Sequence, residues 1–298
     1  MCFLLCYDRH QFYPYIKLNP VPLYLKLRKM TTMGPWTLGA CIYDMADKKI
    51  YEATSDTLNS TDKWVVKVKP NVKTTELYTL LSLNLESQPP NMIKLPPCPY
   101  HTFGMTPEYV WFAMRQYDGH VTKDNAGSWK EIAKACISFM EILHCEHHRL
   151  YMDFKLDNIL VNGSEFIVSD YENITQVETN KLTSASRSTK WYYMARGGEP
   201  DEWLYSWKMD LMSLAYMLIT LTSDEKDVKI CDQLIRQRFG KRSINSSMKK
   251  IALKRNKIMY EAANPVLKQY LDIIKDLPWD DWDPPSYKLY SSLSALFV

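Results

Sequence analysis

Alternating apolar and polar positions dominate the chain between residues 36 and 70 and predict β-strands there. The segments Trp36–Ile42 and Ile50–Tyr51 predict two strands. A third is expected over residues 63–70, where apolar and basic residues alternate before a proline ends the pattern. The unbroken apolar run at Tyr109–Met114 predicts a buried strand. This part of the chain therefore favours a small antiparallel sheet.

Elsewhere the hydrophobic spacing is that of helices. An apolar helix is expected to begin at Thr75, before the proline-rich residues 87–99, which predict a loop. A nearly all-apolar segment at residues 210–221 predicts a buried helix. A further helix is predicted by apolar residues that recur at three- and four-residue steps, namely Ile132, Cys136, Phe139, Met140 and Leu143.

This order of elements, strands first and helices afterwards, predicts an α+β fold with two lobes. The β-rich lobe is expected at about residues 33–116 and the mainly helical lobe at about residues 117–298, with a connector near residues 117–127. Residues 1–32 hold many aromatics and prolines without a clear period. They predict an N-terminal arm that is disordered or loosely attached.

The composition narrows the class of protein. The chain has 298 residues, 46% of them hydrophobic, and a net charge of +3, which is too small to indicate nucleic-acid binding by itself. Seven irregularly spaced cysteines fit a reducing compartment. No apolar run approaches the roughly 18 residues of a membrane span. We therefore expect no membrane partner and a cytoplasmic or nuclear protein.

Residues 236–257 are rich in Lys and Arg and contain no acid. The simplest interpretation is that these charges form the solvated face of helices. The second interpretation is a nuclear-import signal. Nucleic-acid binding is disfavoured because aromatic residues are not interleaved with these charges. A cluster of His and Cys at residues 144–148 lies at the end of the predicted helix. It lacks a second ligand pair at zinc-finger spacing, so zinc binding is disfavoured.

Candidate chemistry is concentrated in the stretch Y-M-D-F-K-L-D-N at residues 151–158. It places an acid, a lysine and an amide within six positions. An apolar run at residues 159–161, a turn at Asn162-Gly163 and a return strand ending in Asp170 follow. Phosphoryl transfer needs an acid at the substrate hydroxyl, a lysine at the moving phosphoryl group, and an amide with a second acid at the metal.

The pattern D-x-K-x-x-N followed by an apolar hairpin and Asp-Tyr resembles a protein kinase, and the resemblance covers most of the chain from about Trp36. It implies a Ser/Thr kinase that transfers the γ-phosphate of ATP to protein hydroxyls with Mg²⁺ as cofactor. In that case Asp153 is the catalytic base or orienter and Lys155 lies against the γ-phosphate. Asn158 and Asp170 hold the metal ion.

The resemblance extends to the nucleotide site. Lys67, between two valines on a predicted strand, resembles the lysine that holds the α- and β-phosphates, and Glu76 resembles its helix partner. By the same register Val65 and Leu160 sandwich the adenine, and Met114 lies at its back. The residues implied to support the site are Tyr151, Tyr171 and Asp210, the last by anchoring the backbone of the catalytic loop.

The details are similar to the vaccinia-related kinases, cousins of the casein-type kinases that occur in animals and poxviruses. Residues 65–70, V-V-K-V-K-P, resemble that group's V-V-K-V-E-P. The Asp170-Tyr171 pair and residues 210–216 are also similar to the group. Ser188-Thr189 falls where the group has Gly-Thr. A poxviral origin is consistent with these residues.

Two departures keep a second function open. No glycine remains between Ile42 and Tyr51, where the family has its glycine-rich loop, and Asp44 and Asp47 there would repel phosphates. Glu172 replaces the glycine after Asp170-Tyr171. The resemblance therefore leaves two functions open, an active kinase or a pseudokinase with weak or no ATP binding. A pseudokinase would act through protein partners, for example by modulating an active relative.

A third interpretation is a scaffold that uses only its surface, with the acidic and aromatic residues 279–285 as a dock. Protein substrates or protein partners are thus expected in every case. The sequence does not indicate an oligomeric state.

Overall fold

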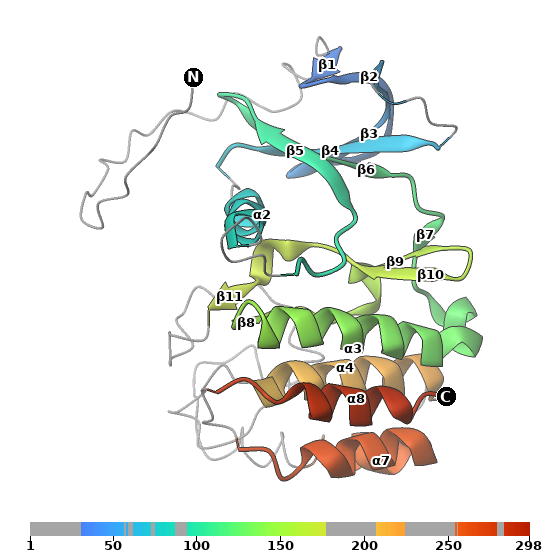
Figure 1. The fold of residues 1–298 in the computed structure, drawn as a ribbon. Coiled ribbons are helices and arrows are strands. Elements are labelled where there is room, and N and C mark those ends of the chain that lie inside the picture. Colours follow the sequence, from blue (N-terminus) through green and yellow to red (C-terminus); the bar gives the residue numbers. More distant parts are fainter. Residues whose placement is uncertain are drawn as a thin grey trace, which may run out of the picture.

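The computed structural model of the chain describes residues 31–56, 58, 62–72, 75–86, 94–176, 207–223, 254, 256–278 and 283–298. Most of the predicted N-terminal arm, the Ser188-Thr189 pair and nearly all of the basic segment 236–257 lie outside these residues, as do the four residues 279–282 of the predicted acidic dock. The fold is α+β, as the sequence predicts. A curled antiparallel sheet lies at one end and a set of helices at the other (Figure 1).

The main sheet has six strands in the order β1-β2-β3-β4-β6-β5, with every neighbouring pair antiparallel. The predicted strands near residues 36, 50, 63 and 109 are confirmed, whereas β5 was missed because polar His101 and Thr102 and the small Gly104 interrupt its apolar pattern. The strand bounds are β1 Thr32–Met33, β2 Trp36–Met45, β3 Lys48–Thr54, β4 Trp64–Pro70, β5 Tyr100–Met105 and β6 Tyr109–Arg115.

Strand β4 separates two apolar clusters because its side chains alternate between the faces of the sheet. Val66 and Val68 pack into a small cluster with Trp36 and Trp111. Val65 points to the opposite face and joins the main core. Lys67 and Lys69 share the face of Val65 by the same alternation, so two lysines are directed into the interior of the molecule.

The hairpin formed by β2 and β3 is longer and tighter than the sequence predicts. We expected one strand to end at Ile42 and the next to begin at Ile50. The structure pairs Met45 with Lys48 and leaves only Ala46 and Asp47 as the turn. Cross-strand pairing of Asp44 with Lys49, joined by an ion pair of 2.8 Å, helps to extend the strands.

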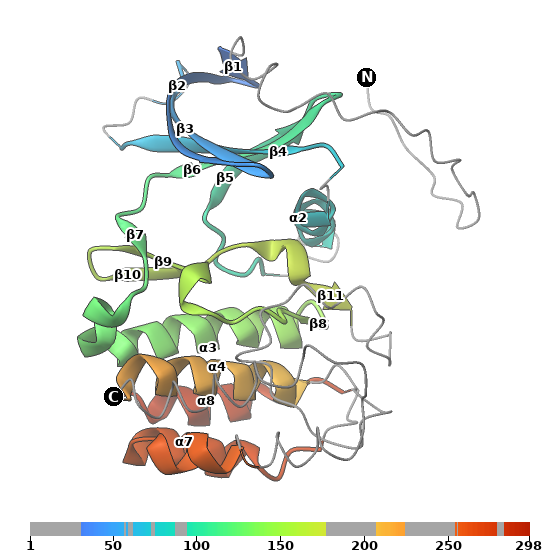
Figure 2. The same cartoon turned by 180° about the vertical axis from the view of Figure 1, so that it is seen from behind.

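The helices form the other end of the molecule, and Figure 2 shows the same arrangement from behind. Helix α2 lies beside the sheet, whereas α3, α4, α7 and α8 pack against one another. The helices predicted from Thr75, around residues 132–143 and around residues 210–221 are confirmed. The bounds are α2 Thr75–Glu86, α3 Trp129–Cys145, α4 Trp207–Thr222, α7 Pro265–Ile274 and α8 Tyr287–Ala295.

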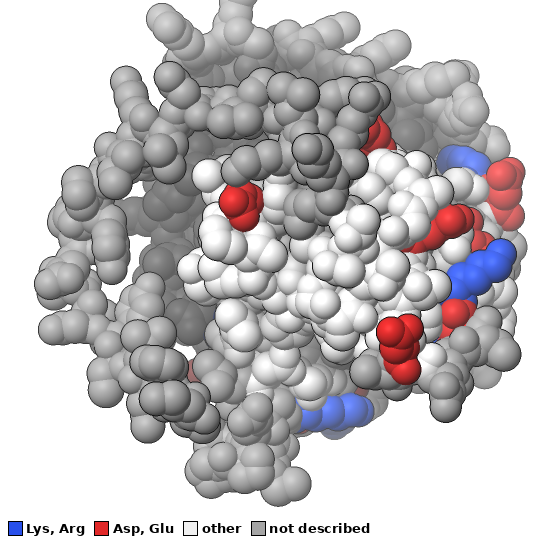
Figure 3. Space-filling view, turned by 90° about the horizontal axis from the view of Figure 1, so that it is seen from above, with Lys and Arg blue, Asp and Glu red and all other residues white. Residues whose placement is uncertain are grey.

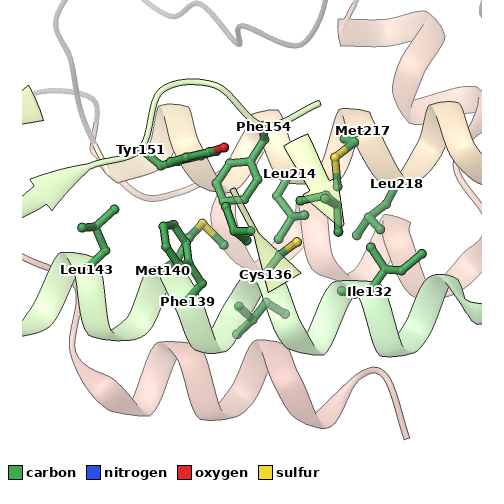
Figure 4. Packing of buried hydrophobic residues seen from close by; sticks show 14 of the residues in the cluster. Ile132, Cys136, Phe139, Met140, Leu143, Tyr151, Phe154, Leu214, Met217 and Leu218 are labelled. Atoms are coloured by element: carbon green, nitrogen blue, oxygen red, sulfur yellow. The ribbon is translucent and has the colours of Figure 1, made fainter. Parts of the chain in front are cut away.

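The main core lies between α3 and α4. The apolar face predicted for α3 is buried, and Phe139 and Met140 are at most 1% exposed. Figure 4 shows this face directed towards Leu214, Met217 and Leu218 of α4, with Tyr151 and Phe154 packed between the helices. Burial of each large side chain contributes about 1.5–3 kcal/mol, so this contact gives the loop that holds residues 151–158 a rigid base.

Short strands and 3₁₀ turns connect the sheet to the helices. The predicted hairpin is confirmed as β9 (Ile159–Asn162) and β10 (Glu165–Val168), and Gly163 takes a positive φ of 57° in its turn. The remaining short elements are β7 Gly119–His120, β8 Arg149–Leu150, β11 Thr175–Gln176, η2 Lys123–Ser128, η3 Leu156–Asn158 and η4 Tyr171–Asn173. Strand β7 pairs with β9, and β8 pairs with β11.

The face of the molecule at the sheet end carries few charged side chains among the described residues (Figure 3). Seen from the sheet end (Figure 3), the described surface is mostly uncharged, and its charged side chains lie mainly towards one edge. Among the helices in the described parts of the chain, none combines the length and the hydrophobicity that a bilayer-spanning segment needs.

Candidate functional site

A buried carboxylate and a buried ammonium group meet between the sheet and α2. Lys67 Nζ lies 3.0 Å from Glu76 Oε1 and 2.9 Å from Oε2, and the two side chains are 7% and 0% exposed. Burial by itself would raise the pKa of Glu76, but Lys67 and Lys69 outweigh it and lower the pKa. Burial would likewise lower the pKa of Lys67, but Glu76 and Asp170 raise it. Glu76 and Lys67 are therefore both charged.

Two further groups bind Glu76 that the sequence did not indicate. Lys69 Nζ lies 2.8 Å from Glu76 Oε2, and the hydroxyl of Tyr100 donates to Oε1. Lys69 also contacts Glu172 Oε2 at 2.9 Å. Its side chain is 6% exposed. Strand alternation could have indicated that Lys69 shares the buried face of Lys67 and needs a counter-charge, but not which residues supply it.

The loop between β8 and β9 gathers donors around Asp153. Lys155 Nζ lies 2.5 Å from its Oδ2, Asn158 Nδ2 lies 2.9 Å away and Asn173 Nδ2 lies 3.1 Å away. All three contacts end on Oδ2, so within the described part of the chain Oδ1 stays available as an acceptor. Burial of the carboxyl raises the pKa of Asp153, although the hydrogen bond and charge of Lys155 oppose this. A raised pKa favours proton acceptance near neutral pH.

The backbone of this loop is held by Asp210 of α4. Its carboxylate accepts hydrogen bonds from the backbone N–H of Tyr151 at 2.6 Å and of Met152 at 2.9 Å, and His144 Nε2 lies 3.1 Å away. Met152 has a φ of 67°, an unfavourable value for a residue with a side chain. The buried carboxylate of Asp210 stabilises this strained backbone, so Asp210 fixes the entry to the loop.

The histidine and cysteine cluster at the end of α3 serves the fold. His147 contacts the carbonyl oxygen of Lys94, and Cys145 donates to that of Pro285. Among the described residues, the cluster forms no group suited to a metal ion.

Aromatic rings connect the two halves of the site. Tyr171 lies with ring centroids 6.1 Å from Tyr100 of the sheet and 5.7 Å from Phe139 of α3. Tyr151 continues the row, 5.3 Å from Phe139, and its hydroxyl donates to the carbonyl oxygen of Ser169. These buried rings hold the segments that carry Asp153 and Asp170 against the sheet and α3.

Asp170 follows β10 with a φ of 62°. Its Oδ1 lies 3.3 Å from Lys67 Nζ and 3.7 Å from Lys69 Nζ. Burial by itself would raise the pKa of Asp170, but Lys67, Lys69, Lys155 and Lys48 outweigh it and lower the pKa to about 2. The carboxylate is therefore charged at neutral pH.

A cavity of about 670 Å³ opens between the sheet and the β9–β10 hairpin. This volume lies within the roughly 300–1,000 Å³ typical of small-molecule sites. Among its lining residues, Lys48, Lys67 and Lys155 all act on the charge of Asp170, and these four residues define what we call its charged end. Seven of the predicted site residues line it, namely Val65, Lys67, Met114, Lys155, Asn158, Leu160 and Asp170. The other five predicted residues do not line the cavity but contact the lining residues or the segments that carry them. They are Glu76, Tyr151, Asp153, Tyr171 and Asp210.

Two residues of this cavity suit a hard cation such as Mg²⁺. Asn158 donates its amide N–H groups to the Asp153 backbone oxygen at 3.0 Å and to Oδ2 at 2.9 Å, which leaves its amide oxygen as a ligand. Asp170 supplies a charged carboxylate. Oxygen ligands of these two kinds are those that Mg²⁺ prefers.

No model of a known protein family matches the chain, and no curated protein matches it.

Glu76→Gln tests the buried charges directly. The substitution leaves the ammonium groups of Lys67 and Lys69 without their shared carboxylate in the interior, and we expect a loss of about 3–5 kcal/mol in the free energy of unfolding. Urea titration followed by circular dichroism measures this. The control Glu52→Gln removes an exposed carboxylate on β3 and should change stability by less than about 0.5 kcal/mol. Equal effects of the two substitutions would contradict the prediction.

The pKa of Asp170 gives a pH dependence. Its folded value of about 2 lies below its usual value of 3.8, so the carboxylate contributes stability that is fully present above the usual value and is lost as the pH falls towards 2. We expect Asp170→Asn to remove up to about 2 kcal/mol of the stability change between about pH 5 and pH 2. Urea titrations across this range test it, with Asp124→Asn as the control at an exposed site. An unchanged pH dependence in Asp170→Asn would show that the assigned charge environment is wrong.

Proposed function

We propose that the chain is a protein-kinase-like phosphotransferase of the Ser/Thr type, similar to the vaccinia-related kinases. The sheet and α2 form its small lobe and the helices its large lobe. The observation that carries this proposal is the convergence on one cavity of residues that lie far apart in the sequence. Lys67, Lys155, Asn158 and Asp170 line it together. In this proposal ATP is the phosphoryl donor and a protein hydroxyl is the acceptor.

The cavity supports a division of roles along the nucleotide. Val65 and Leu160 provide apolar surfaces for the two faces of the adenine, with Met114 at its back. The phosphates lie at the charged end, where Lys67 binds the α- and β-phosphates and Lys155 binds the γ-phosphate. Glu76 holds Lys67 in position through the ion pair of 2.9 Å.

Asp153 acts on the acceptor hydroxyl. Its Oδ2 is held by Lys155, Asn158 and Asn173, so Oδ1 is the oxygen that receives the proton of a serine or threonine. The raised pKa of the carboxyl supports this step. The transfer breaks the bond between the γ-phosphorus and the bridging oxygen, and the hydroxyl oxygen forms the new bond.

Mg²⁺ fits as the cofactor of this site. Asn158 and Asp170 would hold it by their oxygen atoms. When bound, it neutralises the charge of the phosphate oxygens. Lys67 and Asp153 then perform the orientation and proton transfer described above.

One observation favours a second candidate, a pseudokinase that acts through protein partners. The β2–β3 hairpin closes on Ala46 and Asp47, and side chains occupy the positions at which glycine amides would approach phosphates. In addition, Lys67 and Lys69 already contact Asp170. A cytoplasmic or nuclear protein that binds a related kinase would use the same fold without catalysis.

Transfer of labelled γ-phosphate separates the two candidates. We expect purified protein with Mg²⁺ and γ-labelled ATP to label itself or casein. The variant Asp153→Asn should be slower by about 10²–10⁴-fold, because it lacks the proton acceptor. The control Asp272→Asn removes an exposed carboxylate on α7 and should retain the parent rate. Labelling that is absent from the parent, or equal in the parent and Asp153→Asn, would contradict the kinase proposal and leave the pseudokinase.

A further inference from the structure

The β2–β3 hairpin directs one lysine into the cavity. Strand pairing places Met45 opposite Lys48 and Tyr43 opposite Ile50, so these four residues share one face of the hairpin. Tyr43, Lys48 and Ile50 line the cavity together with Lys67, Lys155 and Asp170. Lys49 belongs to the other face, where it pairs with Asp44. The alternation of β3 therefore brings the ammonium group of Lys48, and not that of Lys49, to the charged end of the cavity.

The neighbouring lysines each have an anionic partner. Lys67 pairs with Glu76, Lys69 with Glu76 and Glu172, and Lys155 with Asp153.

Lys48 differs from them. Within the described residues, no carboxylate lies within ion-pair distance of its Nζ, which instead lies 5.2 Å from the centroid of the Tyr43 ring. Burial and the charge of Lys67 lower the pKa of Lys48, and Asp170 compensates only in part. A half-buried ammonium group beside like charges is stabilised when an anion binds.

One of the two acids expected to oppose such an anion, Asp44, is neutralised. Asp44 would repel phosphates if it were unpaired, but its Oδ2 lies 2.8 Å from Lys49 Nζ. The hairpin therefore presents Lys48 to the cavity without a competing charge from Asp44.

We propose that Lys48 binds the terminal phosphates of the nucleotide and replaces the backbone amides that a glycine-rich turn would supply. This inference rests on the proposed function, because it assumes that the cavity holds a nucleoside triphosphate. A turn without glycine keeps its backbone away from a ligand, whereas a lysine side chain reaches across that gap. Lys48 thus approaches the phosphates from the sheet, and Lys155 approaches them from the catalytic loop.

The test measures how much of the binding depends on the phosphates. Isothermal titration calorimetry with Mg²⁺ compares ATP and adenosine on the parent chain, on Lys48→Met and on Lys63→Met. Lys63 is an exposed lysine immediately before β4, and its substitution removes the same charge outside the cavity. We expect Lys48→Met to weaken ATP binding about 10-fold or more and to leave adenosine binding unchanged. Lys63→Met should bind both as the parent does, and Lys48→Arg should recover most of the affinity for ATP.

The other outcomes are also decisive. If the parent binds ATP and Lys48→Met binds it equally well, the role of Lys48 is wrong and the proposed function stands. An equal loss for ATP and adenosine would also overturn the role, because it would indicate general damage to the cavity. If the parent binds neither ligand, the proposed function and the inference both fail. Melting temperatures without ligand show that each variant is folded.

Discussion

The buried carboxylate of Glu76 is the constraint on which the site depends. A charge in the interior must be paired, and Glu76 is paired by Lys67 and Lys69 from β4 and by the hydroxyl of Tyr100 from β5. The backbone N–H of Tyr171 also lies 3.4 Å from it. One side chain of α2 thus joins two strands of the sheet to the segment that carries Asp170. Displacement of any partner would leave an uncompensated charge, so the arrangement is held as a unit.

The unusual residues of the site compensate one another. Glu172 stands where the resemblance to kinases implies glycine, and Lys69 stands where the similar group has glutamate; the two form an ion pair of 2.9 Å. The hairpin lacks glycine but carries Lys48 on its cavity face. Asp44, an apparent obstacle to phosphates, is paired with Lys49. These three departures are therefore accompanied by a compensating charge nearby, which supports the proposed nucleotide site although it differs from the pattern of the family that the sequence resembles.

Much of this arrangement was predictable from the sequence, for physical reasons. The period of two residues located the first strands and that of 3.6 located α3, because burial on one face imposes those patterns. Unbroken apolar runs located β6 and α4, which are buried nearly all round. The close spacing of Asp153, Lys155 and Asn158 made their contact predictable. Tyr100, in contrast, lies on a strand whose polar residues hide its pattern. The pairing of Lys69 with Glu172 joins residues far apart in the sequence, and neither local period nor spacing predicts such contacts. The same holds for the direction of Lys48, which depends on a turn only two residues long.

The measurement that tests the central claim most directly is the melting temperature with and without Mg-ATP, on the parent chain and on Asp170→Asn. A ligand that binds only the folded state stabilises it, by about 2–4 °C for each kcal/mol in a chain of roughly this size. We expect a rise for the parent at saturating Mg-ATP that Asp170→Asn reduces strongly, because in the proposed function the Asp170 carboxylate holds the metal ion. No rise in the parent, or an equal rise in both proteins, would contradict the assignment of the cavity as a metal-nucleotide site.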